Sequence, residues 1–395
     1  MGGRASAALR GPRGEGPRRR RRRLDLAHRR RRVHYCQVPI VPLFGHETLR
    51  ARLTDAVRRG ALAGSVLLHG PAGVGKQRLA LEVARALLCS GSPAPCGACQ
   101  GCRFSAELTH PDLHWYFPRP RLKDGDATPA DVEADVADAV AERAAAHGLY
   151  ARPTGLQALY LPTVRTMLRQ AAMTPALGHR KVFVVGDAER LVSQEGADQA
   201  ANAFLKLLEE PPADTTLLLT SSEPGALLPT IRSRVVAVRV PPLAEAAVRA
   251  FVGHDVVRAR LDATPGVPRS VEERLRLAVG RPGRLLESDE QDAAAAAARR
   301  LLEAAESGSR ARWLRAAGTL GVAKARGGFA NTLEALTPLL HERVRLAVHR
   351  GDERRAVRLS RTMVAVEVAK ERARGNVNPQ LAGAALLREL ASGLR

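Results

Sequence analysis

The sequence is short of aromatic residues and cysteines, and it contains no long apolar run. Aromatic side chains make up 3% of its 395 residues, and there are 5 cysteines. No stretch approaches the roughly 18 consecutive apolar residues that cross a membrane as a helix. No apolar segment accompanies the basic N-terminus as it would in a secretory signal peptide. Transmembrane helices and signal peptides are therefore excluded, and we expect a cytoplasmic protein without a membrane partner.

Acidic residues are also scarce relative to basic ones. The chain has 62 Lys and Arg against 40 Asp and Glu, a net charge of +22, and half of that excess lies in residues 1–36. Abundant alanine and arginine with few aromatics are typical of GC-rich genomes, so arginine number alone does not indicate nucleic-acid binding. We expect residues 1–37 to be a disordered basic tail. A wrongly chosen start codon is the favoured explanation, and a nucleic-acid-binding arm is the alternative.

A phosphate-binding loop is predicted near residue 70. Residues 70–77 read GPAGVGKQ, which follows the P-loop pattern GxxxxGK[ST] up to its last position. The loop falls between an apolar run at 65–69, typical of a strand, and residues 78–88, whose apolar positions have helical spacing. This is the context that a P-loop requires. A glycine-rich turn before an ordinary helix is the alternative.

The loop keeps its phosphate cradle but lacks one metal ligand. Its lysine, Lys76, would reach the β and γ phosphates, while backbone N–H groups wrap the phosphate chain. An active P-loop enzyme then has a Ser or Thr hydroxyl that binds Mg²⁺, and this chain has Gln77 there. The glycines that allow the cradle are Gly70, Gly73 and Gly75.

A second catalytic position is vacant further along the chain. Residues 182–187 read VFVVGD, a buried-strand pattern that ends in Asp187, as in a Walker B segment. The glutamate that usually follows this aspartate is replaced by Ala188, and Glu189 lies one residue too late to point the same way. We therefore expect little ATP hydrolysis. A capping role for Asp187 is the alternative to a metal role.

Four cysteines form a candidate metal site. Cys89, Cys96, Cys99 and Cys102 lie in a stretch rich in Gly, Pro and Ser, which cannot form a core of its own. We predict a structural tetrahedral Zn²⁺ with Zn–S bonds near about 2.3 Å. Disulfides and an iron–sulfur cluster are the less favoured alternatives. Cys36 lies in the basic tail and is assigned no role.

The longest specific motif spans residues 198–212, which read DQAANAFLKLLEEPP. It resembles the ANALLKxLEEPP signature of bacterial DNA polymerase III clamp-loader subunits, the gamma/tau and delta-prime group of AAA+ proteins. The likeness extends over residues 39–395 with gaps. Further similar segments are Phe44-Gly45-His46, the cysteine cluster, His110-Pro111-Asp112, residues 230–234 (TIRSR) and residues 376–381 (NVNPQL).

Within this family the vacant positions favour the delta-prime type. Gamma/tau subunits have the hydroxyl after the P-loop lysine and an Asp-Glu pair, and Gln77 and Ala188 depart from both. Residues 280–284 (GRPGR) also resemble the delta-prime lid more closely. Arg234 matches the arginine of the family motif Ser-Arg-Cys, although Val235 replaces the cysteine.

The resemblance implies a subunit that does not hydrolyse ATP but supplies Arg234 as an arginine finger in trans. Such a residue contributes on the order of 10³- to 10⁵-fold in rate. The implied partners are gamma/tau and delta subunits, the sliding clamp and primed DNA, within a DNA polymerase holoenzyme. An ATP-hydrolysing gamma/tau-type motor subunit is the alternative, and a free-standing nucleic-acid-binding protein is a third possibility. ATP or ADP binding stays open. The expected nucleotide contacts are Gly70, Gly73, Gly75, Lys76, Gln77, Asp187, Thr220 and Arg284.

The expected architecture has an α/β AAA+ domain followed by two helical regions. Residues 38–242 form the AAA+ domain, a parallel sheet with helices on both faces. It contains the zinc module at 89–102 and a surface insertion at 119–158 that is assigned no function. Within this insertion Val132, Val136 and Val140 lie on one face of a predicted helix. A small helical lid follows at 243–288. Residues 289–395 form an all-α collar that oligomerises in the family.

Overall fold

The computed structural model describes Gly2 and residues 40–122, 127–151, 157–191, 197–287, 289–320, 326–374 and 378–394. The chain divides into two units, Met1–Cys36 and Gln37–Arg395, and every element below belongs to the second. Our predictions for the basic tail, for Cys36 and for residues 376–377 lie outside the described residues.

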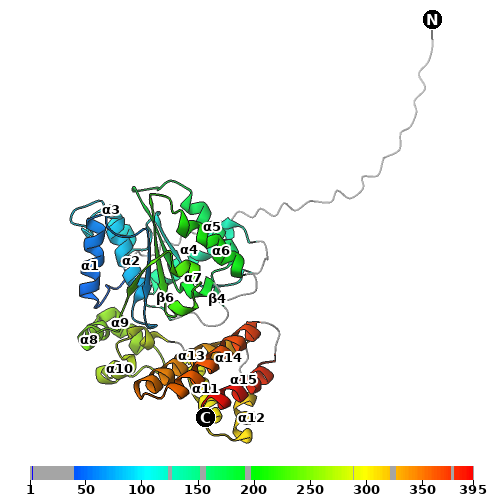
Figure 1. The fold of residues 1–395 in the computed structure, drawn as a ribbon. Helices are drawn as coiled ribbons and strands as arrows, with labels where there is room; N and C mark the ends of the chain where they lie inside the picture. Colours follow the sequence, from blue (N-terminus) through cyan, green and yellow to red (C-terminus); the bar gives the residue numbers. More distant parts are fainter. Residues whose placement is uncertain are drawn as a thin grey trace. The chain divides into compact units, whose positions relative to one another are not determined.

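A parallel sheet of five strands forms the centre of the α/β region (Figure 1). The strand order is β2-β5-β6-β1-β7. All residues of β5 and β6 are buried, which explains why these strands read as continuous apolar runs rather than alternating ones. The predicted parallel sheet is confirmed. The strands are β1 (Ser65–His69), β2 (Leu113–Tyr116), β5 (Lys181–Val185), β6 (Thr215–Ser221) and β7 (Val236–Arg239).

Alternate residues of each strand pack into two cores, one on each face of the sheet. Val182 and Val184 belong to the core that contains apolar residues of α1 and α2, whereas Phe183 and Val185 belong to the core that contains residues of α5 and α6. Because successive strand side chains point to opposite faces, helices cover both sides, as predicted. These helices are α1 (Glu47–Arg58), α2 (Lys76–Leu87), α5 (Leu161–Ala171) and α6 (Ala197–Glu209).

The segment expected as a surface insertion packs against the sheet. It starts and ends in a short antiparallel pair, β3 (Arg119–Pro120) and β4 (Gln157–Ala158), and contains the helix α4 (Pro129–Ala145). A capping box at Thr128 and Asp131 begins α4. On this helix Val132 is buried, while Val140 and Val136 are half-buried and each packs against one of the two cores. The remaining short elements here are α3 (Gln100–Ala106), η1 (Ala188–Leu191), η2 (Pro224–Ala226) and α7 (Pro229–Arg232).

Three helices and a 3₁₀ turn follow the sheet. Their apolar residues Phe251, Leu261 and Leu285 join the same core as α2. Arg274 is 1% exposed and donates to Asp262 Oδ1 at 2.5 Å, so a buried charge is neutralised within this segment. The assignment as a lid stays a prediction. The elements are α8 (Glu245–Gly253), α9 (Asp255–Asp262), α10 (Val271–Ala278) and η3 (Pro282–Leu286).

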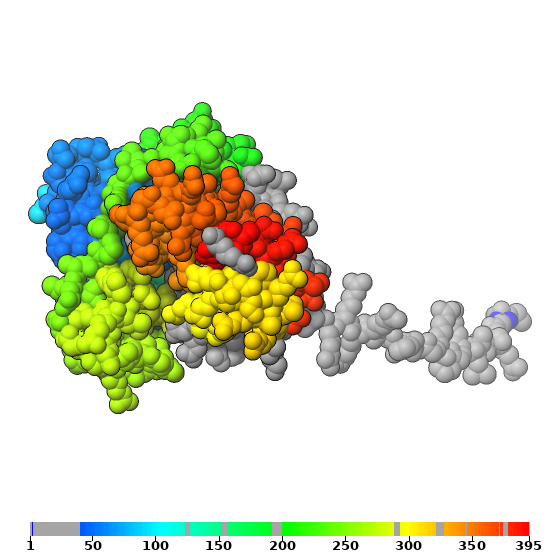
Figure 2. Space-filling view, turned by 60° about the horizontal axis from the view of Figure 1, so that its bottom comes forward, coloured from blue at the N-terminus to red at the C-terminus, as the bar shows by residue number. Residues whose placement is uncertain are grey.

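The C-terminal region is a bundle of helices around a separate apolar core. Helix α12 lies against α15, as the yellow and red segments of Figure 2 show. Its helical character is confirmed, and its role as an oligomerising collar stays a prediction. No helix among the described residues has the length and apolarity to cross a membrane. The helices are α11 (Asp289–Glu306), α12 (Arg310–Thr319), α13 (Arg326–His349), α14 (Glu353–Arg374) and α15 (Pro379–Leu394).

Candidate functional site

The predicted phosphate loop connects β1 to α2 as the sequence indicated. Gly70, Gly73 and Gly75 all have positive φ angles, of 155°, 82° and 93°. Residues other than glycine rarely adopt such φ angles, so the backbone conformation of the loop requires the three glycines. His46 fixes the loop from outside, because its Nε2 lies 2.8 Å from Val74 O. The family-like Phe-Gly-His motif therefore supports the loop.

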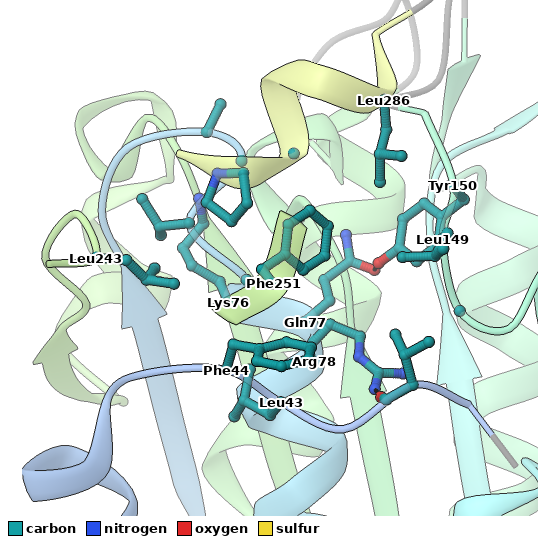
Figure 3. A pocket seen from close by; sticks show the side chains of 18 of the residues that line it. Leu43, Phe44, Lys76, Gln77, Arg78, Leu149, Tyr150, Leu243, Phe251 and Leu286 are labelled. Atoms are coloured by element: carbon teal, nitrogen blue, oxygen red, sulfur yellow. Dashed lines mark hydrogen bonds between the residues drawn. The ribbon is translucent and has the colours of Figure 1, made fainter. Parts of the chain in front are cut away.

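A cavity of about 140 Å³ lies beside the loop (Figure 3). Its walls are mostly apolar, with Leu43, Phe44, Leu149 and Phe251 among them, and its polar groups cluster at the loop. Apolar walls with a few converging polar groups are typical of small-molecule sites. The lining comes from residues 41–44, 72–78, 148–150, Asp187, Ser222, Leu243, Phe251, 282–283 and Leu286.

The P-loop lysine is held by the protein itself. Lys76 Nζ donates to Gly70 O at 2.9 Å, to Pro71 O at 2.8 Å and to Ser222 Oγ at 2.9 Å. An ammonium group has three protons to donate, so each of them has an acceptor. A phosphate entering the loop would have to replace these acceptors.

Gln77 is the centre of a hydrogen-bond network. Its Nε2 donates to Asp187 Oδ2 at 3.2 Å. Its Oε1 accepts from Trp115 Nε1 at 3.1 Å, from the Tyr150 hydroxyl at 3.2 Å and, in the longest contact, from Arg143 Nη1 at 3.4 Å. The predicted pair of Gln77 and Asp187 is thus brought together, but through an amide rather than a metal-binding hydroxyl.

The segment after Asp187 does not place a glutamate in the cavity. Asp187 has a φ of 47°, and the chain then turns into η1. The Oε2 of Glu189 is buried, and its Oε1 accepts from Ser222 N at 3.0 Å. Burial, together with the charge of Asp187, raises the pKa of Glu189 to about 7. The position after Asp187 holds the buried Ala188, so no carboxylate occupies the place of the usual catalytic glutamate.

Three predicted nucleotide contacts, Gly70, Thr220 and Arg284, lie outside the cavity lining. Thr220 Oγ1 accepts from Asp187 N at 3.1 Å, so Thr220 holds the backbone of the aspartate. Ser222, two residues later, lines the cavity. Arg284 is not among the lining residues, although its neighbour Gly283 is. Gly283 N donates to Gly73 O at 2.9 Å, and a Cβ at position 283 would lie 2.7 Å from Gly73 Cα. This segment therefore contacts the loop backbone directly.

The inserted segment contributes site residues that the sequence analysis missed. Leu149 and Tyr150 line the cavity, and Arg143 at the end of α4 reaches Gln77. A signal was present in the sequence: Arg143 lies four and seven residues after Ala139 and Val136 on one helical face, where a charge is unusual. A charged residue at that position is expected to point into the protein rather than into solvent.

Arg78 is a further charged group at the cavity. Its Nη2 donates to Val41 O, and Nη1 is buried without a hydrogen-bond acceptor among the described residues. Burial lowers the pKa of Arg78 to about 10, which leaves the guanidinium charged at neutral pH.

The four cysteines of the predicted metal site come together. The Sγ atoms of Cys89, Cys96, Cys99 and Cys102 all lie within 4.8 Å of one another, and those of Cys89 and Cys99 are 3.7 Å apart. Four sulfurs around a tetrahedral zinc at about 2.3 Å are about 3.8 Å apart, so the cluster fits such an ion.

Backbone N–H groups support the sulfurs of this cluster. Cys96 N donates to Cys89 Sγ at 3.2 Å, Cys99 N to Cys96 Sγ at 3.3 Å and Cys102 N to Cys99 Sγ at 3.4 Å. Such bonds stabilise thiolates. A Cβ at Gly91 would lie 2.6 Å from Cys96 Sγ, so the turn requires this glycine. The loop is therefore able to hold a metal ion.

The family-like His-Pro-Asp segment is structural. Asp112 is buried, and its carboxylate accepts from Ala176 N at 2.6 Å, Leu177 N at 2.8 Å and Gly178 N at 3.2 Å. His110 Nδ1 accepts from Asp112 N at 3.1 Å. These bonds fix the turn that leads into β5.

The predicted arginine finger lies at the surface, just after α7. Arg234 Nη1 donates to Thr230 O at 3.0 Å, and Nη2 forms an ion pair with Glu209 Oε1 at 2.6 Å. The side chain of Arg234 is 35% exposed. Glu209 belongs to the LEEPP motif, so the two most specific family-like segments meet at this pair.

Comparison with known proteins gives a family match over the α/β region. A family model described as "DNA polymerase III, delta subunit" matches residues 45–244, just over half of the chain. The chain is 36% identical over 180 residues to the DNA polymerase III subunit delta' of Pseudomonas aeruginosa, covering 45% of this chain and 43% of that protein. For the Bacillus subtilis delta' subunit the identity is 28% over 192 residues, covering 48% and 46%.

Gamma/tau subunits are also similar to this chain. The DNA polymerase III subunit gamma/tau of Mycobacterium tuberculosis is 29% identical over 202 residues, covering 51% of this chain and 28% of that protein. Each of these three matches spans less than half the length of the relative.

A solved structure from Thermotoga maritima, described as a gamma-subunit-related protein, has 16% identity and a TM-score of 0.35. It covers 88% of this chain and 99% of that one. On the evidence of the family match and the curated relatives, this chain belongs to the DNA polymerase III delta-subunit family, in which these relatives carry the name delta'.

Proposed function

We propose that this chain is the delta-prime subunit of a DNA polymerase III clamp loader. In this role it does not hydrolyse ATP itself, supplies Arg234 to the ATP site of a neighbouring subunit, and helps to load the sliding clamp onto primed DNA. Its partners are gamma/tau and delta subunits in a hetero-oligomeric ring. The observation that carries the proposal is the combination of a blocked P-loop with an arginine held at the surface.

The P-loop geometry supports the absence of hydrolysis. Hydrolysis requires a metal ligand after the loop lysine and a carboxylate that orients the attacking water. Gln77 donates a hydrogen bond to Asp187 in place of the first, and Ala188 stands in place of the second. Glu189 accepts from the backbone of Ser222, and its Oε2 is buried. The site can hold a nucleotide as a fixed ligand, but it lacks the groups that break the γ-phosphate bond.

The surroundings of Arg234 support its action on another subunit. Its ion pair with Glu209 is partly exposed, and such pairs contribute only about 0 to 1 kcal/mol. The guanidinium can therefore exchange this carboxylate for a triphosphate at low cost. Its bond to Thr230 O holds the side chain in one direction while it does so.

A gamma/tau-type motor subunit is the second candidate, because a gamma/tau protein is 29% identical to this chain over 202 residues. The two proposals differ in a simple measurement. If the isolated chain turns over ATP at an appreciable rate, the motor assignment replaces the delta-prime one.

The first prediction tests Arg234 in a ring reconstituted from this chain and its own gamma/tau and delta subunits. Arg234→Ala should lower the ATPase rate of the site that it completes by on the order of 10³-fold, and clamp loading should fall with it. Arg232→Ala is the matched control, since Arg232 is also exposed and lies two residues earlier, at the end of α7. Size-exclusion chromatography checks that both variants assemble. Full-speed clamp loading by an assembled Arg234→Ala ring would rule out the finger.

A further inference from the structure

Mg²⁺ does not fit the P-loop site of this chain. Magnesium takes oxygen ligands in a near-octahedral shell. The group of Gln77 that faces Asp187 is the amide NH₂, which donates at 3.2 Å and cannot bind a cation. The Gln77 carbonyl oxygen, which could bind one, already accepts from Trp115, Tyr150 and Arg143.

The direction of this amide is fixed by its neighbours. Turning it over would place the NH₂ group against three donors and the carbonyl oxygen against the carboxylate of Asp187. Burial raises the pKa of the Tyr150 hydroxyl, so this group stays protonated and donates. A divalent ion therefore cannot enter by a simple rotation of Gln77.

Without a metal ion at Asp187, Arg143 is placed to supply a positive charge nearby. Arg143 is 9% exposed, and a guanidinium stays charged in proteins. Three aromatic rings enclose it: its Cζ lies 3.3 Å from the ring centroid of Phe117, 3.9 Å from that of Tyr150 and 4.6 Å from that of Trp115. Desolvated contacts of this kind are favourable by about 2 kcal/mol or more.

The charge reaches Asp187 through a single side chain. Arg143 Nη1 donates to Gln77 Oε1, and Gln77 Nε2 donates to Asp187 Oδ2. Burial lowers the pKa of Arg143, while Tyr150 and Asp187 oppose that shift. Hydrogen bonds that run in series from a cation to an anion polarise one another. The amide of Gln77 is therefore an uncharged bridge between an internal cation and an internal anion.

We propose that Arg143, delivered by the inserted helix α4 and enclosed by Trp115, Phe117 and Tyr150, replaces the divalent cation of the P-loop site as the counter-charge of Asp187. The site then works without a metal ion. This gives the inserted segment a role in the site. The inference rests on the loop geometry and not on the action of Arg234, so either can fail without the other.

The test uses the full chain with its cysteine cluster loaded, without nucleotide, in the presence and absence of added Mg²⁺. Chelators are avoided because they would strip the cluster. The thermal unfolding midpoint of the natural protein should be the same in both conditions. Mn²⁺, followed by electron paramagnetic resonance, should not bind at the loop.

A double variant that lacks both Arg143 and Gln77 should respond to a metal ion. Arg143→Met keeps an apolar side chain inside the aromatic rings but removes the charge, and Gln77→Thr restores a hydroxyl. In the double variant Mg²⁺ should raise the midpoint by at least about 2 °C, and Mn²⁺ should bind. Arg169→Met is the control, since Arg169 forms an exposed ion pair with Glu133 on the neighbouring helix.

Two outcomes would overturn the proposal. One is Mn²⁺ binding by the natural protein that Asp187→Asn abolishes, since the site would then accept a metal beside Arg143. The other is a folded double variant with identical midpoints with and without Mg²⁺ and no Mn²⁺ signal. Arg143 would in that case serve only to pack α4.

Discussion

The side chain of Gln77 fits beside Asp187 because the residue before Asp187, Gly186, has no side chain. A Cβ at Gly186 would lie 2.6 Å from both Cδ and Nε2 of Gln77, and 2.7 Å from Oε1. Real Cβ atoms do not approach other atoms so closely, so the glycine at the end of β5 and the glutamine of the loop form a matched pair. The sequence identified Gln77 as a departure from the P-loop pattern. It did not identify Gly186, because the two positions are far apart in the chain.

The raised pKa of Glu189 gives a prediction on stability at the residue scale. In the folded protein this carboxyl holds its proton until about pH 7, whereas in the unfolded chain it loses the proton near 4.5. Between these values the folded state binds more protons, so stability falls as pH rises. Glu189→Gln stays neutral and keeps an acceptor for Ser222 N. Above pH 7 it should stabilise the protein by on the order of 2 to 3 kcal/mol.

Chemical unfolding on both sides of this pH range measures the effect. Glu210→Gln is the control, because Glu210 is an exposed glutamate within the LEEPP motif. The variant should lose its advantage at low pH, where both carboxyls are protonated. Equal stability of Glu189→Gln and the natural protein at all pH values would show that Glu189 is not buried in its charged form.

At the scale of elements, the inserted segment shows where sequence reasoning stops. Its helix was predicted from the apolar spacing at Val132, Val136 and Val140, and α4 confirms that spacing. The segment was nevertheless taken as a surface feature without function. Its contribution depends on Arg143 and Tyr150 meeting Trp115, and such meetings follow from tertiary packing rather than from local pattern. Periodicity predicts a buried face but not what lies opposite.

The cysteine loop is an element whose order we expect to depend on a metal. Residues 89–99 contain no helix or strand, so few backbone hydrogen bonds hold them without an ion. Cys96→Ser should therefore abolish binding of one equivalent of Zn²⁺ and lower the unfolding midpoint by several degrees, by about 2 to 4 °C per kcal/mol lost. Metal analysis of the purified protein, together with calorimetry, measures both effects.

Cys36→Ser is the matched control, since Cys36 stands apart from the cluster in the sequence. It should change neither the zinc content nor the midpoint. A natural protein that contains iron and labile sulfide instead would show that the cluster was assigned the wrong metal.

For the whole molecule, the sequence predicted a parallel sheet with helices on both faces and a helical C-terminal region, and both are confirmed. It succeeded where local signals are strong: the apolar runs of β1, β5 and β6, the loop glycines, and the spacing of the four cysteines. Thr220 and Arg284, like Gly70, lie outside the cavity lining, and their contacts with a nucleotide stay predictions. Which side of a strand end faces a cavity depends on twist and packing, and the motif does not contain that information.

The uneven charge of the chain gives a prediction at this scale. Residues 1–36 carry half of the net charge of +22, and Met1–Cys36 forms a unit separate from Gln37–Arg395. Every site residue described above lies in the second unit. Deleting residues 1–37 should therefore change the unfolding midpoint by less than about 1 °C and leave assembly with the partner subunits intact. Scanning calorimetry and size-exclusion chromatography test this, and loss of assembly would favour a nucleic-acid-binding or docking role for the tail.

The contact between Gly73 and Gly283 has a mechanical consequence. No side chain separates the two backbones, and Gly283 N donates to Gly73 O at 2.9 Å. There is thus no compressible layer at this point, and any widening of the cradle displaces η3 by the same amount. Helix α11 begins at Asp289, shortly after η3 ends at Leu286, so a displacement of η3 would also reach the C-terminal helices. If the loop binds a nucleotide without hydrolysing it, as proposed, its occupancy would still alter the position of these helices.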